Sequence, residues 1–270
     1  MPMFTGFQRT NQPFITARPV ELFAGIPKTD FGNNGTLPYA QMGNMTAWWE
    51  TSNSITLNSG NVSSMLDKLN SYNMQQATAA NQPLWVQQDS TVRGLSEITF
   101  TSGKSLSAGN ILTIGTGNLS ACVVFMLNAT TPSNNDIIFC QSQNNGASNS
   151  GEWCIRVTAG TSNILTQFFD EVSAKSTTVT TLTLGVVYIV HIVIDRTNGR
   201  LYNYVNNGVQ SATIATTGSN LNPAAALKLN SAGSSGASQI TYEAMMWNTA
   251  LSASDVSQNV NVLKAKYGLP

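Results

Sequence analysis

Short runs of alternating hydrophobic and polar residues recur along most of the chain from residue 45 onward, separated by Asn, Gly, Ser and Thr. Runs of this length, rich in β-branched and aromatic residues, predict strands. We expect strands at residues 47–49, 84–87, 98–100, 107–114, 120–127, 136–140, 152–157, 164–169, 178–182, 186–195, 201–205, 210–214, 227–229 and 239–247. Many short strands at even spacing favour an all-β sandwich.

Two tight turns punctuate this pattern. Asn206-Asn207-Gly208 stands between the strands at 201–205 and 210–214, and Asn198-Gly199 follows the strand at 186–195. Asn and Gly tolerate the left-handed backbone that two-residue hairpin turns require. The sequence therefore predicts two consecutive β-hairpins.

Two segments have helical spacing instead. Residues 61–69 carry four apolar side chains on one helical face, Val62, Met65, Leu66 and Leu69. Residues 252–267 carry a second such stripe, Val256, Val260, Leu263 and Tyr267. Ser252 with Asp255 three residues later is an N-terminal capping pattern, and Gly268 suits the position after the last turn. The second segment is predicted to be a short C-terminal helix.

The first 43 residues differ from the rest, because five of the nine prolines and several glycines interrupt every helical or strand period. Apolar side chains recur there nevertheless: Phe4, Phe7, Phe14, Phe23, Ile26 and Phe31. An ordered segment of this kind must bury them against its own domain or against another subunit. We expect residues 1–43 to be an extended anchoring arm and residues 44–270 to be one domain.

The composition narrows the class of partner. Hydrophobic residues make up 41% of the chain, charged residues only 10%, and the formal net charge is zero. An average soluble protein has roughly 25% charged residues. The thirteen basic residues are scattered singly, which argues against binding to nucleic acid or to an anionic membrane.

The cysteines and the chain ends indicate a soluble protein made in a reducing compartment. Cys122, Cys140 and Cys154 are odd in number and lack C-x-x-C spacing, so we expect neither a disulfide framework nor a zinc site. The N-terminus has no secretory signal pattern, and the longest apolar run, residues 185–194, is too short to span a bilayer. Free thiols favour assembly in the cytoplasm.

A collinear series of short motifs suggests a family. The series is Trp48-Trp49-Glu50, Gly60-Asn61-Val62-Ser63, Asp67-Lys68, Asn81-Gln82-Pro83, Arg93-Gly94-Leu95, Ile98-Thr99-Phe100, Tyr242-Glu243-Ala244 and Ala250-Leu251-Ser252. In this order the motifs resemble concanavalin A-like, laminin-G-like jelly-roll domains of phage virion and bacterial surface proteins. The resemblance covers about residues 45–269 and implies a jelly-roll β-sandwich. Glu50 stands where that family usually has Asp.

The sequence contains no familiar catalytic pattern, and we expect no enzymatic activity. The single histidine, His191, lies within the strand at 186–195, where a buried or half-buried hydrogen-bonded residue is expected. No Gly-x-Ser-x-Gly elbow occurs, nor the Glu-x-Asp-x-x-Glu run of concanavalin A-like glycan hydrolases. We expect Glu243 to accept hydrogen bonds from backbone.

The sequence offers one weak candidate site for a metal ion and one candidate site for a glycan. The resemblance implies calcium as the usual metal of the fold, and Asn134-Asn135-Asp136 offers a weak site with one carboxylate. No other cofactor is expected. An aromatic platform beside amides is typical of glycan binding, and Trp153 with Asn144, Asn145 and Asn149 fits that description. Core packing is the alternative interpretation of Trp153.

The features together favour a structural protein of a phage virion surface, of the capsid-decoration or head-fibre type. We expect it to be assembled in the host cytoplasm, to form homo-oligomers and to bind other virion proteins through residues 1–43. The alternative is a tail-fibre adhesin that binds glycans of the host surface. The sequence leaves the choice between them open.

Overall fold

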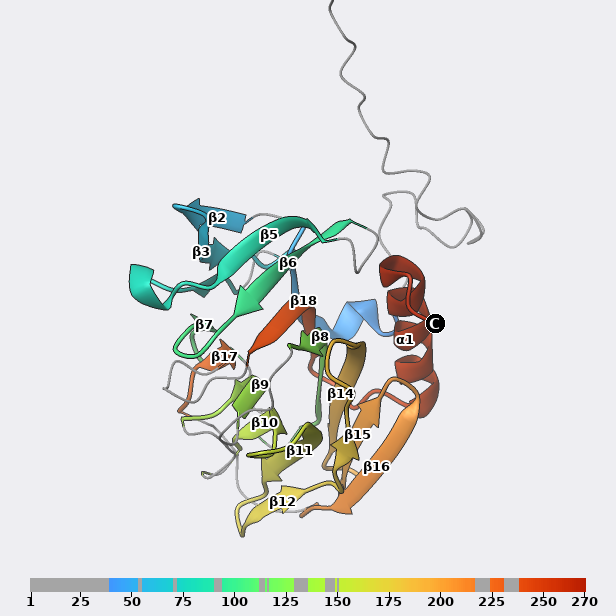
Figure 1. The fold of residues 1–270 in the computed structure, drawn as a ribbon. Helices are drawn as coiled ribbons and strands as arrows, with labels where there is room; N and C mark the ends of the chain where they lie inside the picture. Colours follow the sequence, from blue (N-terminus) through green and yellow to red (C-terminus); the bar gives the residue numbers. More distant parts are fainter. Residues whose placement is uncertain are drawn as a thin grey trace, which may run out of the picture.

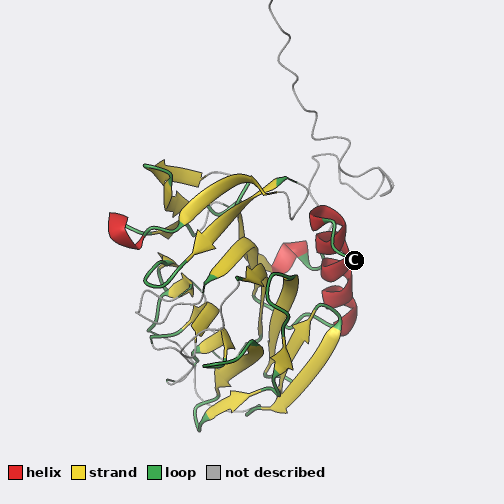
Figure 2. Cartoon of the chain, in the orientation of Figure 1, coloured by secondary structure: helices red, strands yellow, loops and turns green. Residues whose placement is uncertain are grey.

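The computed structural model describes residues 39–52, 55–69, 72–89, 94–111, 115, 117–128, 136–143, 149, 151–216, 224–230 and 238–270. These residues form antiparallel strands and, near the C-terminus, one α-helix (Figures 1 and 2). The prediction of an all-β jelly-roll sandwich with a C-terminal helix is confirmed. No helix among the described residues has the length and apolar character needed to cross a membrane.

The first run of strands forms what we call the first sheet, which lies beside the helix. Its order is β16–β15–β14–β8–β18, and β1 and β6 both pair with the remaining edge of β18. The strands are β1 (Met45–Glu50), β6 (Leu95–Phe100), β8 (Leu119–Leu127), β14 (Val187–Asp195), β15 (Arg200–Val205), β16 (Gly208–Thr213) and β18 (Gln239–Trp247). Both predicted hairpins are present, and Asn206 and Gly199 have the positive φ angles, 53° and 63°, that such turns favour.

The second run of strands forms the second sheet, which lies against the first sheet. Its order is β11–β10–β9–β17–β7–β4–β3–β2, and β12 and β13 both pair with β11. The strands are β2 (Ile55–Asn58), β3 (Asn61–Met65), β4 (Met74–Gln75), β7 (Leu106–Ala108), β9 (Asp136–Gln141), β10 (Trp153–Val157), β11 (Asn163–Phe169), β12 (Ala174–Ser176), β13 (Thr180–Thr181) and β17 (Leu227–Leu229). The strand β5 (Leu84–Asp89) pairs with both β3 and β6 and so links the two runs. Short 3-10 turns occur at η3 (Met42–Asn44) and η4 (Ala79–Asn81).

The main core fills the space between the two runs. Trp49, Phe125, Phe139 and Trp153 are among its fully buried side chains. A second apolar cluster lies on the other face of the first sheet, under the helix α1 (Ala253–Tyr267). The strands β8 and β18 are therefore buried on both faces, which explains why their sequences are almost continuously apolar.

The helix α1 forms where the sequence predicts it. Ser252 accepts a hydrogen bond from the backbone N–H of Asp255, whose carboxylate accepts one from the backbone N–H of Ser252. This reciprocal capping box satisfies amide groups that the first turn leaves without partners. Gly268 ends the helix in the left-handed conformation, with φ of 69°.

The predicted helix at residues 61–69 is wrong. Residues Asn61–Met65 form β3, paired with β2 on one side and with β4 and β5 on the other. Val62 and Met65 are buried, whereas Leu66 and Leu69 are 37% and 36% exposed and follow the strand. Pairing with distant strands has overridden the helical spacing of the apolar residues.

Candidate functional site

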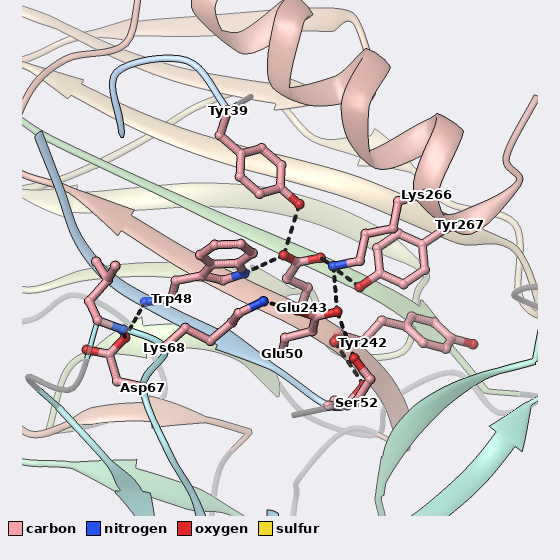
Figure 3. A network of polar contacts seen from close by, with 12 residues as sticks. Tyr39, Trp48, Glu50, Ser52, Asp67, Lys68, Tyr242, Glu243, Lys266 and Tyr267 are labelled. Atoms are coloured by element: carbon pink, nitrogen blue, oxygen red, sulfur yellow. Dashed lines mark hydrogen bonds and ion pairs between the residues drawn. The ribbon is translucent and has the colours of Figure 1, made fainter. Parts of the chain in front are cut away.

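A network of polar side chains, centred on Glu243 of β18, lies between the first sheet and α1 (Figure 3). The Glu243 carboxylate accepts hydrogen bonds from Tyr39 Oη at 3.0 Å and Trp48 Nε1 at 2.5 Å on one oxygen. On the other oxygen it accepts from Lys266 Nζ and Tyr267 Oη, both at 2.7 Å. Glu243 has no exposed surface, so these four donors replace water. The expected backbone donors are replaced by side chains here.

Glu50 of β1 extends the network. Its carboxylate lies 2.6 Å from Lys68 Nζ and 2.9 Å from Lys266 Nζ, and it also accepts a hydrogen bond from Ser52. Burial disfavours the charged form of Glu50, but the positive charges of Lys266 and Lys68 outweigh that effect and lower its pKa to about 2. Two carboxylates therefore lie beside two ammonium groups, and Lys266 bridges them.

The ionisation of the other members follows from the same charges. Burial alone would lower the pKa of Lys266, but Glu243 and Glu50 raise it, so this lysine stays charged. Burial, reinforced by the charge of Glu243, raises the pKa of Tyr39 and Tyr267 well above the ordinary value. Both phenols are therefore protonated donors at neutral pH.

The network fixes the first described residues onto the domain. The ring of Tyr39 packs edge-on against Trp48, with ring centroids 5.3 Å apart. The backbone N–H of Ala40 donates to Asn259 Oδ1 at 2.7 Å, and Trp247 Nε1 donates to the Ala40 carbonyl at 3.2 Å. The last part of the expected arm, Tyr39–Gly43, thus begins on its own domain, beside α1. Phe4, Phe7, Phe14, Phe23, Ile26 and Phe31 lie outside the described residues, so their anchoring role stays a prediction.

A second polar centre holds the connection between β9 and β10. Glu152 is fully buried and accepts hydrogen bonds from the backbone N–H groups of Gln143 and Asn149, both at 3.0 Å. The Asn149 side-chain amide and the Ser142 hydroxyl also donate to this carboxylate. One buried carboxylate therefore fixes both ends of the segment that carries the predicted glycan-binding amides.

Two of the residues predicted to bind glycans, Trp153 and Asn149, differ in their exposure to solvent. Trp153 is 0% exposed and packs edge-on against Phe139, with ring centroids 5.3 Å apart. Its ring faces the main core because it points inward from β10, so it offers no platform to a ligand, and the core interpretation holds. Asn149 is exposed, while Asn144 and Asn145 lie outside the described residues.

The described residues offer little support for a metal site. Asn134 and Asn135 of the expected calcium loop lie outside the described part, and Asp136 is buried. Burial raises the pKa of Asp136 to about 7, which disfavours the anionic form that calcium requires. No group of three or more His, Cys, Asp or Glu residues with metal-binding geometry occurs within the described ranges.

His191 is a core residue, as expected, but without the expected hydrogen bonds. Among the described residues neither ring nitrogen has a partner, and the ring lies 6.3 Å from that of Trp247. Burial lowers the pKa of His191 to about 3, so the imidazole is neutral at physiological pH.

Comparison with known proteins relates the chain to others by fold alone. No family model and no curated protein matches it. The solved structures that match include Trypanosoma rangeli sialidase, with 10% identity, a TM-score of 0.58, and coverage of 84% of this chain and 34% of that one. The binding domain of Paraclostridial Mosquitocidal Protein 1 matches at 13% identity and a TM-score of 0.61, with coverage of 84% and 56%. The botulinum neurotoxin serotype G binding domain matches at 12% identity and 0.55, with coverage of 84% and 54%.

These matches confirm the β-sandwich fold and correct one expectation. The chain spans between about a third and just over half the length of these neighbours. The expectation of a non-enzymatic protein is contradicted, because about a third of a sialidase chain shares this fold. At 10% identity the likeness is one of fold and is not evidence of catalysis. None of the matched structures named here is a phage protein.

The sequence reasoning missed the network around Glu243. Members of the network are separated by more than 200 positions, so no local pattern links Glu50 with Lys266. One signal was present: Lys266 and Tyr267 stand together at the end of an otherwise apolar helical stripe, where a buried partner is needed.

Proposed function

We propose that the chain is a lectin-like module that binds glycans of a host cell surface and is displayed on a phage virion. The observation that supports glycan binding most directly is the fold, which matches the binding domains of a botulinum neurotoxin and of Paraclostridial Mosquitocidal Protein 1 over 84% of the chain. A matched sialidase was also solved in complex with sialic acid. Sugars of this class are recognised through hydroxyl and amide groups, which this chain has in abundance.

The segment between β9 and β10 is the place where we expect the glycan to bind. Glu152 holds both of its ends, and Asn149 is exposed there. A base that is held rigidly lowers the entropic cost of ordering a binding loop. In Figure 1, β9 and β10 lie away from α1, beside which the chain enters the domain at Tyr39. That placement suits a module anchored at one side and binding at another.

Attachment to the virion rests on the sequence of residues 1–38. Large apolar side chains, including Phe4, Phe7, Phe14, Phe23, Ile26 and Phe31, recur there between prolines and glycines. Burying them on a neighbouring virion subunit would gain roughly 25 cal/mol per Å² of apolar surface, less the cost of ordering the segment. Tyr39 and Ala40 supply a fixed starting point for it on the domain.

A glycan array with the full chain tests the binding proposal. We expect wild-type protein to bind a defined set of glycans and the double variant Asn144→Ala, Asn145→Ala to lose at least tenfold in affinity. The matched control is Asn207→Ala, which removes an exposed amide from the β15–β16 turn and should leave binding unchanged. Absence of glycan binding by wild type, or equal loss in both variants, would refute the proposed site.

Co-sedimentation with purified phage particles tests the anchoring proposal separately. We expect the full chain to sediment with particles and a chain starting at Tyr39 to remain in the supernatant. The shortened chain keeps the contacts of Tyr39 and Ala40 with the domain, so its fold is retained as a control. Equal sedimentation of both chains would place the virion contact on the domain and overturn the role of residues 1–38.

A further inference from the structure

Two of the three cysteines lie directly opposite one another on neighbouring strands. Cys140 of β9 and Cys154 of β10 are register partners in an antiparallel pair. Directly opposed residues in such a pair share one face of the sheet, with Cβ atoms about 4.5–5.5 Å apart. A disulfide needs Cα atoms about 4.4–6.8 Å apart and Cβ atoms about 3.5–4.5 Å apart. The register therefore brings the two thiols to within a small adjustment of bonding distance.

The pair faces away from the main core. On β10 the neighbours Trp153 and Ile155 point into the core, so Cys154 points to the outer face of the second sheet. Cys140 and Cys154 form a small separate cluster with Ile137. Across the sheet the row continues with Lys228 beside Cys140 and Gln167 beside Cys154. Two adjacent thiols at the centre of a polar row are not required by the packing of the core.

The third cysteine lies elsewhere and serves as an internal reference. Cys122 is on β8 in the first sheet, and it belongs to the cluster under α1. The first sheet and the main core stand between it and the outer face of β9 and β10. Cys122 is therefore unable to reach either of the other two thiols in the folded domain.

We infer that Cys140 and Cys154 are a modification site, at which the reduced protein is converted by a small disulfide oxidant into a form with a cross-strand disulfide. In the first step a thiolate of the pair attacks oxidised glutathione, forms a mixed disulfide and releases one glutathione thiol. The second cysteine then attacks the mixed disulfide and releases the other glutathione. Two protein thiols are oxidised to one disulfide, and one oxidised glutathione is reduced to two thiols.

The bond would act on the segment between the two strands. It would tie β9 to β10 directly beside the Gln141–Trp153 register pair, from which the segment held by Glu152 extends. Both thiols are fully buried, so exchange requires the sheet to open and is slow in the folded protein. A chain that folds in a reducing compartment would keep both thiols, and one that folds in an oxidising medium would form the cross-strand disulfide.

Refolding of the full chain in a glutathione redox buffer tests this inference. We expect a mass 2 Da below that of the reduced chain. Cleavage at Asp136 and Glu152 separates the three cysteines into different peptides, so the cross-linked pair can be identified. The variant Cys122→Ser should keep the bond, while Cys140→Ser and Cys154→Ser should lose it. Export of the chain to a bacterial periplasm provides the same readout without refolding.

Thermal unfolding supplies a second readout. The disulfide would close a loop of about 15 residues, for which we expect Tm to rise by roughly 5–10 °C, with reversal by dithiothreitol. Native-like protein in which both thiols remain free after folding under oxidising conditions would overturn the inference. A bond between Cys122 and either partner would overturn it as well.

Discussion

Lys266 is the residue whose loss should most sharply test the network between β1, β18 and α1. Its ammonium group lies 2.7 Å from Glu243 and 2.9 Å from Glu50, and the side chain is almost fully buried. In Lys266→Met the stem is replaced at similar volume, but Glu50 is left with Lys68 alone, and Glu243 has no ammonium partner among the described residues. Removing one member of a buried ion pair costs about 3–5 kcal/mol, because the partner charge stays without compensation. We expect the free energy of unfolding to fall by that amount.

The matched control is Lys264→Met on the same helix. Lys264 is only partly buried, and Met and Lys have similar helix propensities, so we expect a change within about 0.5 kcal/mol. Urea unfolding followed by tryptophan fluorescence measures both, since Trp48 and Trp247 lie in or beside the network. A double variant that adds Glu243→Gln should recover part of the loss by removing one of the two carboxylate charges.

Free energies of unfolding of Lys266→Met and Lys264→Met that differ by less than about 1 kcal/mol would contradict this prediction. Such a result would mean that water or a rearrangement compensates the two carboxylates, and that the buried charges contribute little to stability.

Three further predictions follow from the described contacts. Burial lowers the pKa of His191 to about 3, so below pH 6.5 the unfolded state takes up a proton that the folded state does not. The free energy of unfolding of the wild type should therefore fall by about 2 kcal/mol between pH 7.5 and pH 5. Urea titrations at the two pH values should show that this loss is absent in His191→Leu. Tyr39→Phe removes a buried donor to Glu243 and should cost about 1–2 kcal/mol in urea unfolding, and an unchanged midpoint would argue against the contact. Glu152→Ala leaves the amides of Gln143 and Asn149 without their acceptor, so hydrogen exchange at both should accelerate at least tenfold, while exchange in α1 stays unchanged.

The sequence predicted those elements whose signals are local. Ser252, Asp255 and Gly268 define both ends of α1, and Asn206 and Gly199 mark the hairpins, because each acts within a few residues. The helix expected at 61–69 failed because apolar residues at helical spacing in a short segment are also compatible with a strand and a following turn.

The candidate sites were harder to predict than the fold. Trp153 was proposed as a glycan platform on the strength of the neighbouring amides, but side-chain direction along β10 depends on a register that the sequence does not reveal. The partners of Glu243 come from the beginning and from the end of the described sequence, and only the folded sheet brings Tyr39 and Lys266 together. Residues that meet across about 200 positions leave no local trace.

The pairing of β1 with β18 has a consequence for synthesis on the ribosome. Trp48 and its neighbours on β1 register with residues 243–247, so β1 has no partner from β18 until those residues have been synthesised, about 200 positions later. Closing a loop of that length is entropically costly and slow. Translation that halts before residue 239 would leave β8 without β18 along one edge, and such edges associate between chains. Products truncated before β18 should therefore accumulate as aggregates, and the domain should remain in solution only once β18 has been synthesised.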